Sequence, residues 1–345
     1  MGKMSLSIII PVHNSEDYLT ECVESVLPGL NQEDEVILVE NGSSDSSWEI
    51  CCRYNDAYPC VRALRLETAG VSKARNCGIS AAKGNWIVFL DSDDILDPGL
   101  VPAVHELDIE ADILLFEYRF LDEGPAEVDP RSDIRNVSAD LLRRAVLQYA
   151  KYRTQISEAA NLDNVTIWSC CAKLIRRDFL ISHQIHFPER LCLSEDTAFC
   201  LQLFCNAEKV CCMEQNAFYY RRTPNSASRI HHPKQLENNQ YLREWTYQYV
   251  RTMGLYEELK NELSSYLARK FIDECLYLIY SDTEKGVRIG YIRENASESY
   301  MAQAIISAKY RYLIAGKRHC LRHWPILWAL KRKLYRLVFI PKFMR

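Results

Sequence analysis

Short apolar segments alternate with helical patterns through the first hundred residues, and this alternation constrains the fold more than any other feature. Four segments are predicted to be strands: Leu6–Val12, which is predicted to be buried, Glu35–Glu40, Val61–Leu66, and the wholly apolar Trp86–Leu90. Helical patterns separate them, and the third, Val71–Ala82, is followed by Gly84 as a predicted C-cap. Because continuous apolar strands that alternate with helices form parallel sheets covered on both faces, we expect an α/β fold.

Polar residues follow three of these strands at their carboxyl ends. They form the runs Pro11-Val12-His13-Asn14, Glu40-Asn41-Gly42-Ser43-Ser44-Asp45 and Asp91-Ser92-Asp93-Asp94. In open α/β sheets, ligands bind beyond the carboxyl ends of the strands, so we expect the functional site there. Asp91, Asp93 and Asp94 offer the oxygen ligands that Mg²⁺ and Mn²⁺ prefer. From spacing alone, these acids could instead only cap the helix near Pro98.

Composition and charge exclude several classes of protein. The net charge of −4 gives no overall attraction to nucleic acid, so we expect no nucleic-acid partner. The fourteen cysteines include no CxxC pair, which favours buried, reduced thiols over a structural zinc site. The first apolar run is shorter than a signal sequence, and no stretch is apolar enough to cross a bilayer. We therefore expect a cytoplasmic protein.

Motifs in a fixed order carry a family resemblance. They are Ser7-Ile-Ile-Ile-Pro-Val-His-Asn14, Val39-Glu-Asn-Gly-Ser-Ser-Asp45, Gly70-Val-Ser-Lys-Ala-Arg-Asn76 and Trp86-Ile-Val-Phe-Leu-Asp-Ser-Asp-Asp94. Further matches are Ile167-Trp168, Lys173-Leu174, Phe187-Pro188, Ser194-Glu-Asp196 and Tyr219-Tyr-Arg-Arg222. The series resembles the inverting family 2 glycosyltransferases with the GT-A fold, a Rossmann-like, mostly parallel sheet flanked by helices. The resemblance covers about residues 5 to 228.

This resemblance implies a nucleotide-sugar donor, with a UDP-sugar favoured. The Pro11-Val12-His13-Asn14 turn would line the base and ribose. Where the family usually has Asp-Asp, this chain has Glu40-Asn41. The second family Asp accepts a proton from the uracil ring, so Asn41 leaves the identity of the base open. Arg75 matches a position near the donor phosphates, and the alternative for it is a surface ion pair.

The resemblance also implies the catalytic groups. In the DxD motif, Asp91 would contact the ribose and Asp93 would hold Mn²⁺ or Mg²⁺. Asp91 or Asp94 could be a further metal ligand. Ser92, between the two aspartates of the motif, would also contact the donor. Asp196 would act as the general base, since a carboxylate can take the proton of an acceptor hydroxyl. The structural alternative for Asp196 is a helix N-cap. Glu195 would orient the acceptor. Trp168 would form the floor of the acceptor site, or else pack in the core.

The motifs end near residue 232, which suggests a domain boundary. We expect a glycosyltransferase domain at 1–232, with a donor half at about 1–110 and an acceptor half at about 111–232. Residues 233–345 would form a helical C-terminal region. After Glu298 this region has no acidic residue, and basic and aromatic residues alternate there. Such a tail favours peripheral contact with the inner face of the membrane; the alternative is packing on the catalytic domain or an oligomer contact.

Two other functional classes fit the sequence less well than a glycosyltransferase. A sugar nucleotidyltransferase would be expected to have a glycine-rich, basic loop after the first strand, and Pro11-Val12-His13-Asn14 is not one. A non-enzymatic membrane-surface or nucleic-acid-binding module would leave Asp91, Asp93 and Asp196 unexplained. We therefore predict a glycosyltransferase acting on a glycan or lipid-linked acceptor in cell-surface polysaccharide or lipid-linked glycan assembly.

Overall fold

The computed structural model describes residues 4–123, 134–148, 165–223, 234–281, 284–308 and 325–333. The chain divides into two compact units. The first comprises Met1–Leu142 and Leu162–Ile230, and the second Arg143–Asn161 and His231–Arg345. The expected boundary after residue 232 and the donor and acceptor halves stay predictions.

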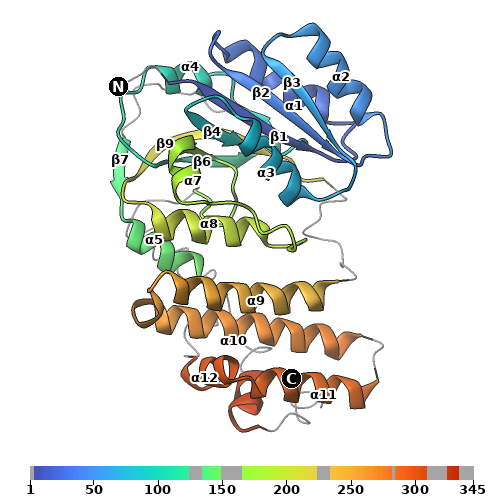
Figure 1. Cartoon of the computed structure of the whole chain (residues 1–345), viewed down its shortest axis with the longest axis vertical. Coiled ribbons are helices and arrows are strands. Elements are labelled where there is room, and N and C mark those ends of the chain that lie inside the picture. The colour runs from blue at the N-terminus through green and yellow to red at the C-terminus, as the bar shows by residue number, and fades with distance from the viewer. Residues whose placement is uncertain are drawn as a thin grey trace. The chain divides into compact units, whose positions relative to one another are not determined.

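The first unit is built on a nine-stranded sheet, counted over the described residues, in the order β3-β2-β1-β4-β8-β6-β9-β5, with β7 beside β9 (Figure 1). Its first four strands run parallel: β1 (Leu6–Val12), β2 (Glu35–Asn41), β3 (Val61–Leu66) and β4 (Trp86–Phe89). Each lies within one residue of its predicted bounds. Every residue of β1, β2 and β4 is buried, which explains their continuous apolar sequences.

The remaining strands make the sheet mixed. They are β5 (Ile95–Leu96), β6 (Ile113–Phe120), β7 (Ile134–Val137), β8 (Lys173–Arg176) and β9 (Val210–Tyr220). Strand β8 runs antiparallel to β4 and β6, and β5 and β7 run antiparallel to β9, whereas β6 and β9 are parallel. The antiparallel strand β8 therefore joins the parallel half predicted from the sequence to the rest of the sheet.

Helices and short 3₁₀ turns connect the strands of this unit. They are α1 (Leu19–Val26), η1 (Leu27–Gly29), α2 (Ser47–Ala57), α3 (Val71–Ala81), α4 (Leu100–His105), η2 (Leu121–Glu123), α5 (Ala139–Val146), α7 (Arg177–Ser182) and α8 (Glu195–Asn206). Helix α5 continues into the second unit, whose boundary falls at Arg143. Helix α3 packs tightly on β1, because a Cβ atom at Gly78 would lie 2.3 Å from Cγ2 of Ile9.

Gly84 does not have the role predicted for it. Helix α3 ends at Ala81, and its C-cap is Ala82, whose backbone is extended. A Cβ atom at position 84 would lie 2.6 Å from the carbonyl carbon of Leu6 and 2.7 Å from the amide nitrogen of Ser7. Glycine is required here because two backbones approach closely, and not because a helix ends.

The second unit contains the helices α9 (Gln235–Thr252), α10 (Tyr256–Tyr280), α11 (Lys285–Ser297) and α12 (Ser299–Ser307), in agreement with the predicted helical C-terminal region (Figure 1). A fully buried ion pair joins the first two. Arg243 donates to Glu274 through Nε at 2.6 Å and through Nη2 at 3.0 Å. Asn295 of α11 and Tyr300 of α12 accept from the same guanidinium, so one charge links all four helices.

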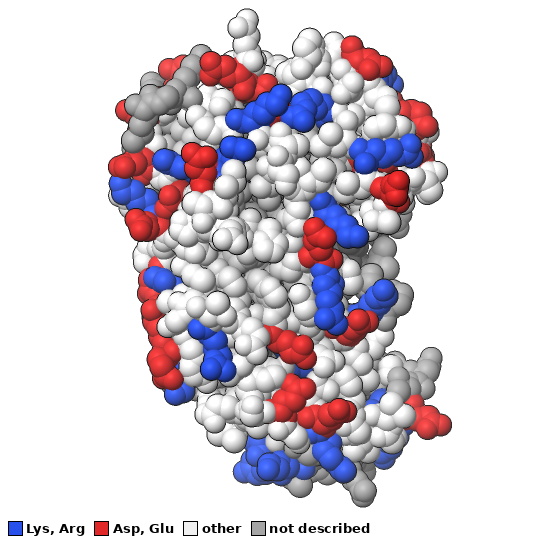
Figure 2. Space-filling view, in the orientation of Figure 1, with Lys and Arg blue, Asp and Glu red and all other residues white. Residues whose placement is uncertain are grey.

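Residues 309–324 and 334–345 carry most of the predicted basic tail and lie outside the described residues. The membrane contact of the tail therefore stays a prediction. Among the described helices, none has both the length and the apolar character needed to span a bilayer. On the face shown in Figure 2, acidic and basic side chains are interspersed. All cysteines in the described ranges carry free thiols; eight of these thiols are buried as predicted, whereas four are half-buried and Cys192 is exposed.

The close packing of α3 on β1 gives a paired test of stability. Gly78→Ala should lower the free energy of unfolding by about 1–3 kcal/mol, because the new methyl group overlaps Ile9. Gly290→Ala, in the interior of α11 with no atom within 4 Å of the new methyl, should be neutral or stabilise by about 0.5–1 kcal/mol. Thermal and urea unfolding of both variants measure this. Equal changes in the free energy of unfolding for the two variants would contradict the close packing of α3 on β1.

Candidate active site

Three loops meet at the carboxyl edge of the parallel strands. The loop after β1 bonds to the loop after β2, because the amide of Asn14 donates to Ser43 Oγ at 3.1 Å and Asn14 Oδ1 accepts from the amide of Ser44 at 2.9 Å. The loop after β4 joins them through a 2.7 Å hydrogen bond between the hydroxyls of Ser15 and Ser92. The predicted donor-side residues, from Pro11 to Asp94, therefore come together at one edge.

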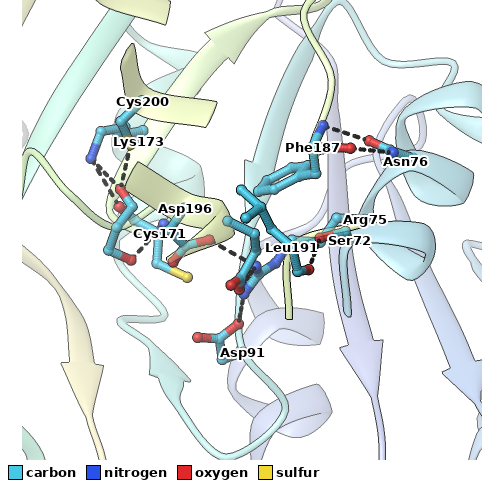
Figure 3. Close-up of polar contacts among 12 residues, drawn as sticks. Ser72, Arg75, Asn76, Asp91, Cys171, Lys173, Phe187, Leu191, Asp196 and Cys200 are labelled. Atoms are coloured by element: carbon cyan, nitrogen blue, oxygen red, sulfur yellow. Dashed lines mark hydrogen bonds and ion pairs between the residues drawn. The ribbon is translucent and has the colours of Figure 1, made fainter. Parts of the chain in front are cut away.

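One buried arginine connects this edge to a distant helix. Arg75 of α3 donates through Nη1 to Glu195 Oε1 at 3.0 Å and to Asp196 Oδ1 at 2.7 Å, and through Nη2 to Asp91 Oδ1 at 2.9 Å (Figure 3). The Arg75 side chain is only 4% exposed, so the surface ion pair considered from the sequence is not what the structure contains. Its guanidinium carbon also lies 5.2 Å from the ring centre of Phe187.

The pKa values in this cluster follow from burial and charge. Burial by itself lowers the pKa of Arg75, but Asp196, Asp91 and Glu195 outweigh it and hold that pKa well above its usual value. Burial and the neighbouring Asp196 raise the pKa of Glu195, and Arg75 opposes them. Arg75 thus stays charged and carries the positive charge that permits three carboxylates to gather.

Helix α3 holds the chain segment that leads to Asp196. Asn76 Oδ1 accepts from the amide of Phe187 at 2.8 Å, and Asn76 Nδ2 donates to the carbonyl of Phe187 at 2.9 Å. The hydroxyl of Ser72 donates to the carbonyl of Leu191 at 3.4 Å. The N-cap of α8 is Ser194 in a left-handed conformation, so Asp196 lies inside the first turn and is not the N-cap itself.

The acids after β4 are crowded. Burial and the nearby Asp91 raise the pKa of Asp94 to about 9, and the same two causes raise the pKa of Asp93. Asp94 Oδ1 accepts from the amide of Arg221 at 2.9 Å. Helix α4 does not use these acids as caps, because Asp97 bonds to the amide of Gly99 at its start. Within the described residues, no group of three or more His, Cys, Asp and Glu side chains is arranged to hold a metal ion.

Glu40 and Asn41 form hydrogen bonds and an ion pair with other residues of the protein. Asn41 is buried, donates from Nδ2 to the carbonyl of Val12 at 2.8 Å and accepts on Oδ1 from the amide of Gly70 at 2.9 Å. Glu40 is fully buried; Oε1 accepts from the amide of Ser43, and Oε2 lies 3.1 Å from Nε of Arg65. In this structure Asn41 joins β1 to the loop before α3, a role that the sequence did not indicate.

The remaining predicted residues lie around this edge. His13 is exposed, with Nδ1 3.2 Å from the carbonyl oxygen of Asn41. Trp168 is half-buried in the loop before β8. Sequence reasoning assigned no role to Asn76, Phe187 or Lys173, although all three lie in the quoted motifs. Their positions in those motifs were the available signal, but the contacts that give them roles join residues far apart in the chain.

Comparison with known proteins identifies the family. A profile of Glycosyl transferase family 2 matches residues 7–183, about half of the chain. The chain belongs to this family and is a glycosyltransferase, so the nucleotidyltransferase and non-enzymatic alternatives are set aside.

Individual relatives agree with this assignment. The uncharacterized glycosyltransferase EpsJ of Bacillus subtilis is 31% identical over 267 residues, covering 76% of this chain and 75% of EpsJ. The uncharacterized glycosyltransferase YibD of Escherichia coli is 25% identical over 341 residues, covering 94% of this chain and 92% of YibD. The crystal structure of Staphylococcus aureus TarS 1–349 in complex with UDP superposes with a TM-score of 0.62 at 20% identity, covering 97% and 90% of the two chains. The expected GT-A fold is confirmed.

The hydrogen bonds of Asn41 predict the effect of restoring the usual family residue. In Asn41→Asp, the carboxylate has no N–H for the carbonyl of Val12, which lies 2.8 Å from the present Nδ2. We expect the free energy of unfolding to fall by about 1–3 kcal/mol at neutral pH, measured by urea denaturation. Asn55→Asp is the exposed counterpart: its Oδ1 accepts from the amide of Ala63 at 3.0 Å, and the donor bond that it would lose, from Nδ2 to Asp56 at 3.3 Å, is open to water. An Asn41→Asp variant as stable as Asn55→Asp would refute this role.

Proposed function

We propose that the chain transfers a sugar from a nucleoside-diphosphate donor to an acceptor hydroxyl with inversion at the anomeric carbon. The convergence of Asp91, Glu195 and Asp196 on the buried Arg75 carries this proposal. This convergence brings two parts of the chain into one site. The acids after β4 could bind the donor, and the first turn of α8 could supply the general base. The proposal is further supported by TarS, which shares the fold and has been crystallised with UDP and with UDP-GlcNAc. A UDP-sugar is therefore the favoured donor.

On the donor side, the turn Pro11-Val12-His13-Asn14 would line the base and ribose, with Asp91 toward the ribose. Asn41 would shape this pocket through its bonds to Val12 and Gly70 and leave the base to neighbouring groups. Arg75 would add positive charge near the donor phosphates while its terminal nitrogens hold the three carboxylates.

The acids after β4 fit a divalent cation, Mn²⁺ or Mg²⁺. Burial and the nearby Asp91 raise the pKa values of Asp93 and Asp94, and a bound cation would offset both causes by favouring the ionised carboxylates. Such an ion needs only one or two carboxylates when phosphate and water complete its shell, so the lack of a three-residue cluster is compatible with it. Asp93 would be the main ligand, with Asp91 or Asp94 beside it. When bound, the ion would neutralise charge on the diphosphate leaving group.

Asp196 is proposed as the general base. Its side chain is 22% exposed, against 13% for Glu195, so it is the more accessible acid of the pair. Arg75 fixes one of its oxygens, and the N-terminus of α8 favours its negative charge. Asp196 would take the proton of the attacking hydroxyl in a single in-line displacement. Glu195 would support the acceptor, and Trp168 would offer it an aromatic face.

The class of acceptor is proposed from the named relatives. They include the minor teichoic acid biosynthesis protein GgaA of Bacillus subtilis and the poly(ribitol-phosphate) beta-N-acetylglucosaminyltransferase TarS of Staphylococcus aureus. This chain covers 24% and 35% of these two relatives. We propose an acceptor in cell-surface polysaccharide or lipid-linked glycan assembly.

Calorimetric titration tests the donor site. UDP, GDP, CDP and dTDP are each titrated with Mn²⁺ and again with EDTA. We expect metal-dependent binding of UDP that Asp93→Ala weakens at least about 10-fold, because a carboxylate ligand is lost. Asp178→Ala, which removes a carboxylate whose side chain is 90% exposed, should bind as the unchanged protein does. If the folded protein binds none of the four nucleotides, the donor proposal fails.

Asp196→Asn tests the base. Release of nucleoside diphosphate, followed over a panel of sugar nucleotides, should fall by roughly 10²–10⁴-fold because the amide cannot take the proton. Nucleotide binding should stay within about twofold of the unchanged protein. Glu195→Gln keeps a hydrogen-bond acceptor for Arg75 and should cost less activity than Asp196→Asn. A larger loss in Glu195→Gln would move the role of base to Glu195.

A further inference from the structure

Lys173, the first residue of strand β8, is fully buried. The ammonium of Lys173 donates to the carbonyl oxygens of Thr166 at 2.5 Å, Ser169 at 2.6 Å and Cys171 at 3.4 Å (Figure 3). In the part of the chain that the structure describes, no carboxylate lies within ion-pair distance of it. An ammonium has three N–H donors, and here each has a backbone carbonyl as partner. The side chain of Lys173 therefore binds backbone carbonyls of the loop of residues 166–171.

That loop has an unusual backbone. Its internal bonds use side chains, since the amide of Ser169 donates to Thr166 Oγ1 at 3.3 Å and the amide of Cys171 to Ser169 Oγ at 3.1 Å. Directly before Lys173, Ala172 has a φ of +56°, in the left-handed region that residues with a Cβ atom rarely adopt. Such a conformation persists only where the surroundings determine it. The bonds from Lys173 hold the segment directly before Ala172, and the carbonyl of Ala172 accepts from the amide of Phe116 at 3.0 Å.

The loop reaches the proposed catalytic residues. The thiol of Cys200, on α8, donates to the carbonyl of Ser169 at 3.3 Å, which ties the loop to the helix that begins with Glu195 and Asp196. A hydrogen bond with Cys170 lowers the pKa of the Cys171 thiol, but burial and the charge of Asp91 raise it overall; Arg75 and Asp196 also act on it, which places Cys171 near the acid cluster. Burial raises the pKa of the Cys170 thiol, and the charges of Arg75 and Asp196 also act on that pKa, which places this side chain next to the acid cluster. The same loop carries Trp168.

We propose that Lys173 is a positioning residue that fixes the loop of residues 166–171, so that Trp168 is presented to the acceptor sugar while the loop packs against α8. The lysine touches no reacting atom and acts through the three carbonyl groups. A displacement of about 1 Å at such a loop can reduce a rate by roughly 10²-fold. The use of Trp168 for an acceptor rests on the proposed function, whereas the hold of Lys173 on the loop does not.

The test removes the ammonium and then returns it. Lys173→Ala leaves a space that matches n-propylamine, and n-propanol is a neutral probe of the same length. In the full chain, hydrogen exchange of the Ser169 and Cys171 amides should become at least about 10-fold faster, because their loop loses its three bonds to Lys173. Added n-propylamine should restore slow exchange, and n-propanol should not. Lys209→Ala, which removes an exposed lysine paired with Glu110, should leave both amides unchanged.

A second readout follows Trp168 itself. The protein has six tryptophans, so the fluorescence difference between each variant and the same variant with Trp168→Phe isolates this one. Acrylamide should quench Trp168 more strongly in Lys173→Ala than in the unchanged protein, and n-propylamine should reverse the change. A lysine that only stabilised the fold as a whole would not give local, amine-dependent changes at Trp168.

Each other outcome overturns the proposal. Unchanged exchange in residues 166–171 would show that the loop holds its shape without Lys173. Exchange that rises equally in β1 and β4 would assign Lys173 to overall stability, as would loss of folding in both Lys173→Ala and the similarly shaped Lys173→Met. Titration of UDP with Mn²⁺ separates this inference from the proposed function. If the unchanged protein binds no nucleotide but the loop responds as expected, the donor proposal fails while the role of Lys173 stands.

Discussion

The site depends on one buried positive charge. Arg75 is almost fully enclosed, and a guanidinium can be enclosed only if carboxylates and hydrogen bonds replace the water that it loses. Asp91, Glu195 and Asp196 meet that requirement, and they in turn can gather only around a cation. Because each partner needs the others, α3, the loop after β4 and the first turn of α8 are restricted to one mutual arrangement.

Around this ion cluster, buried and half-buried polar side chains bind the backbone groups of the loops, as neighbouring strands do for each other in the sheet. Asn41 and Asn76 each bond to backbone groups of other segments, and Lys173 binds three carbonyls of one loop. Loops at a strand end have no ladder of backbone hydrogen bonds, so their polar groups need such partners. The result is an irregular backbone that is nevertheless well fixed, as positioned catalytic groups require.

Part of this arrangement was predictable, and the errors have physical causes. Strands β1, β2 and β4 were predicted within one residue because their burial on both faces leaves a local apolar pattern, whereas the edge strand β3 is mostly half-buried. Gly84 was misread as a helix cap because glycine serves close backbone approach and left-handed turns equally well, and sequence does not distinguish them. The family resemblance left the base open at Asn41, whose donor contact stays a prediction; the structure adds that its amide is bonded to Val12 and Gly70.

The sequence by itself determined the α/β class, the order of the motifs and the placement of acids at strand ends, because burial and turn chemistry are written in neighbouring residues. Only the tertiary structure decided which groups meet. Arg75 and Asp196 are 121 positions apart, and Lys173 acts on a loop whose left-handed Ala172 has no mark in the sequence. Pairing across such distances depends on how helices dock on the sheet, and on which charges can be buried only together.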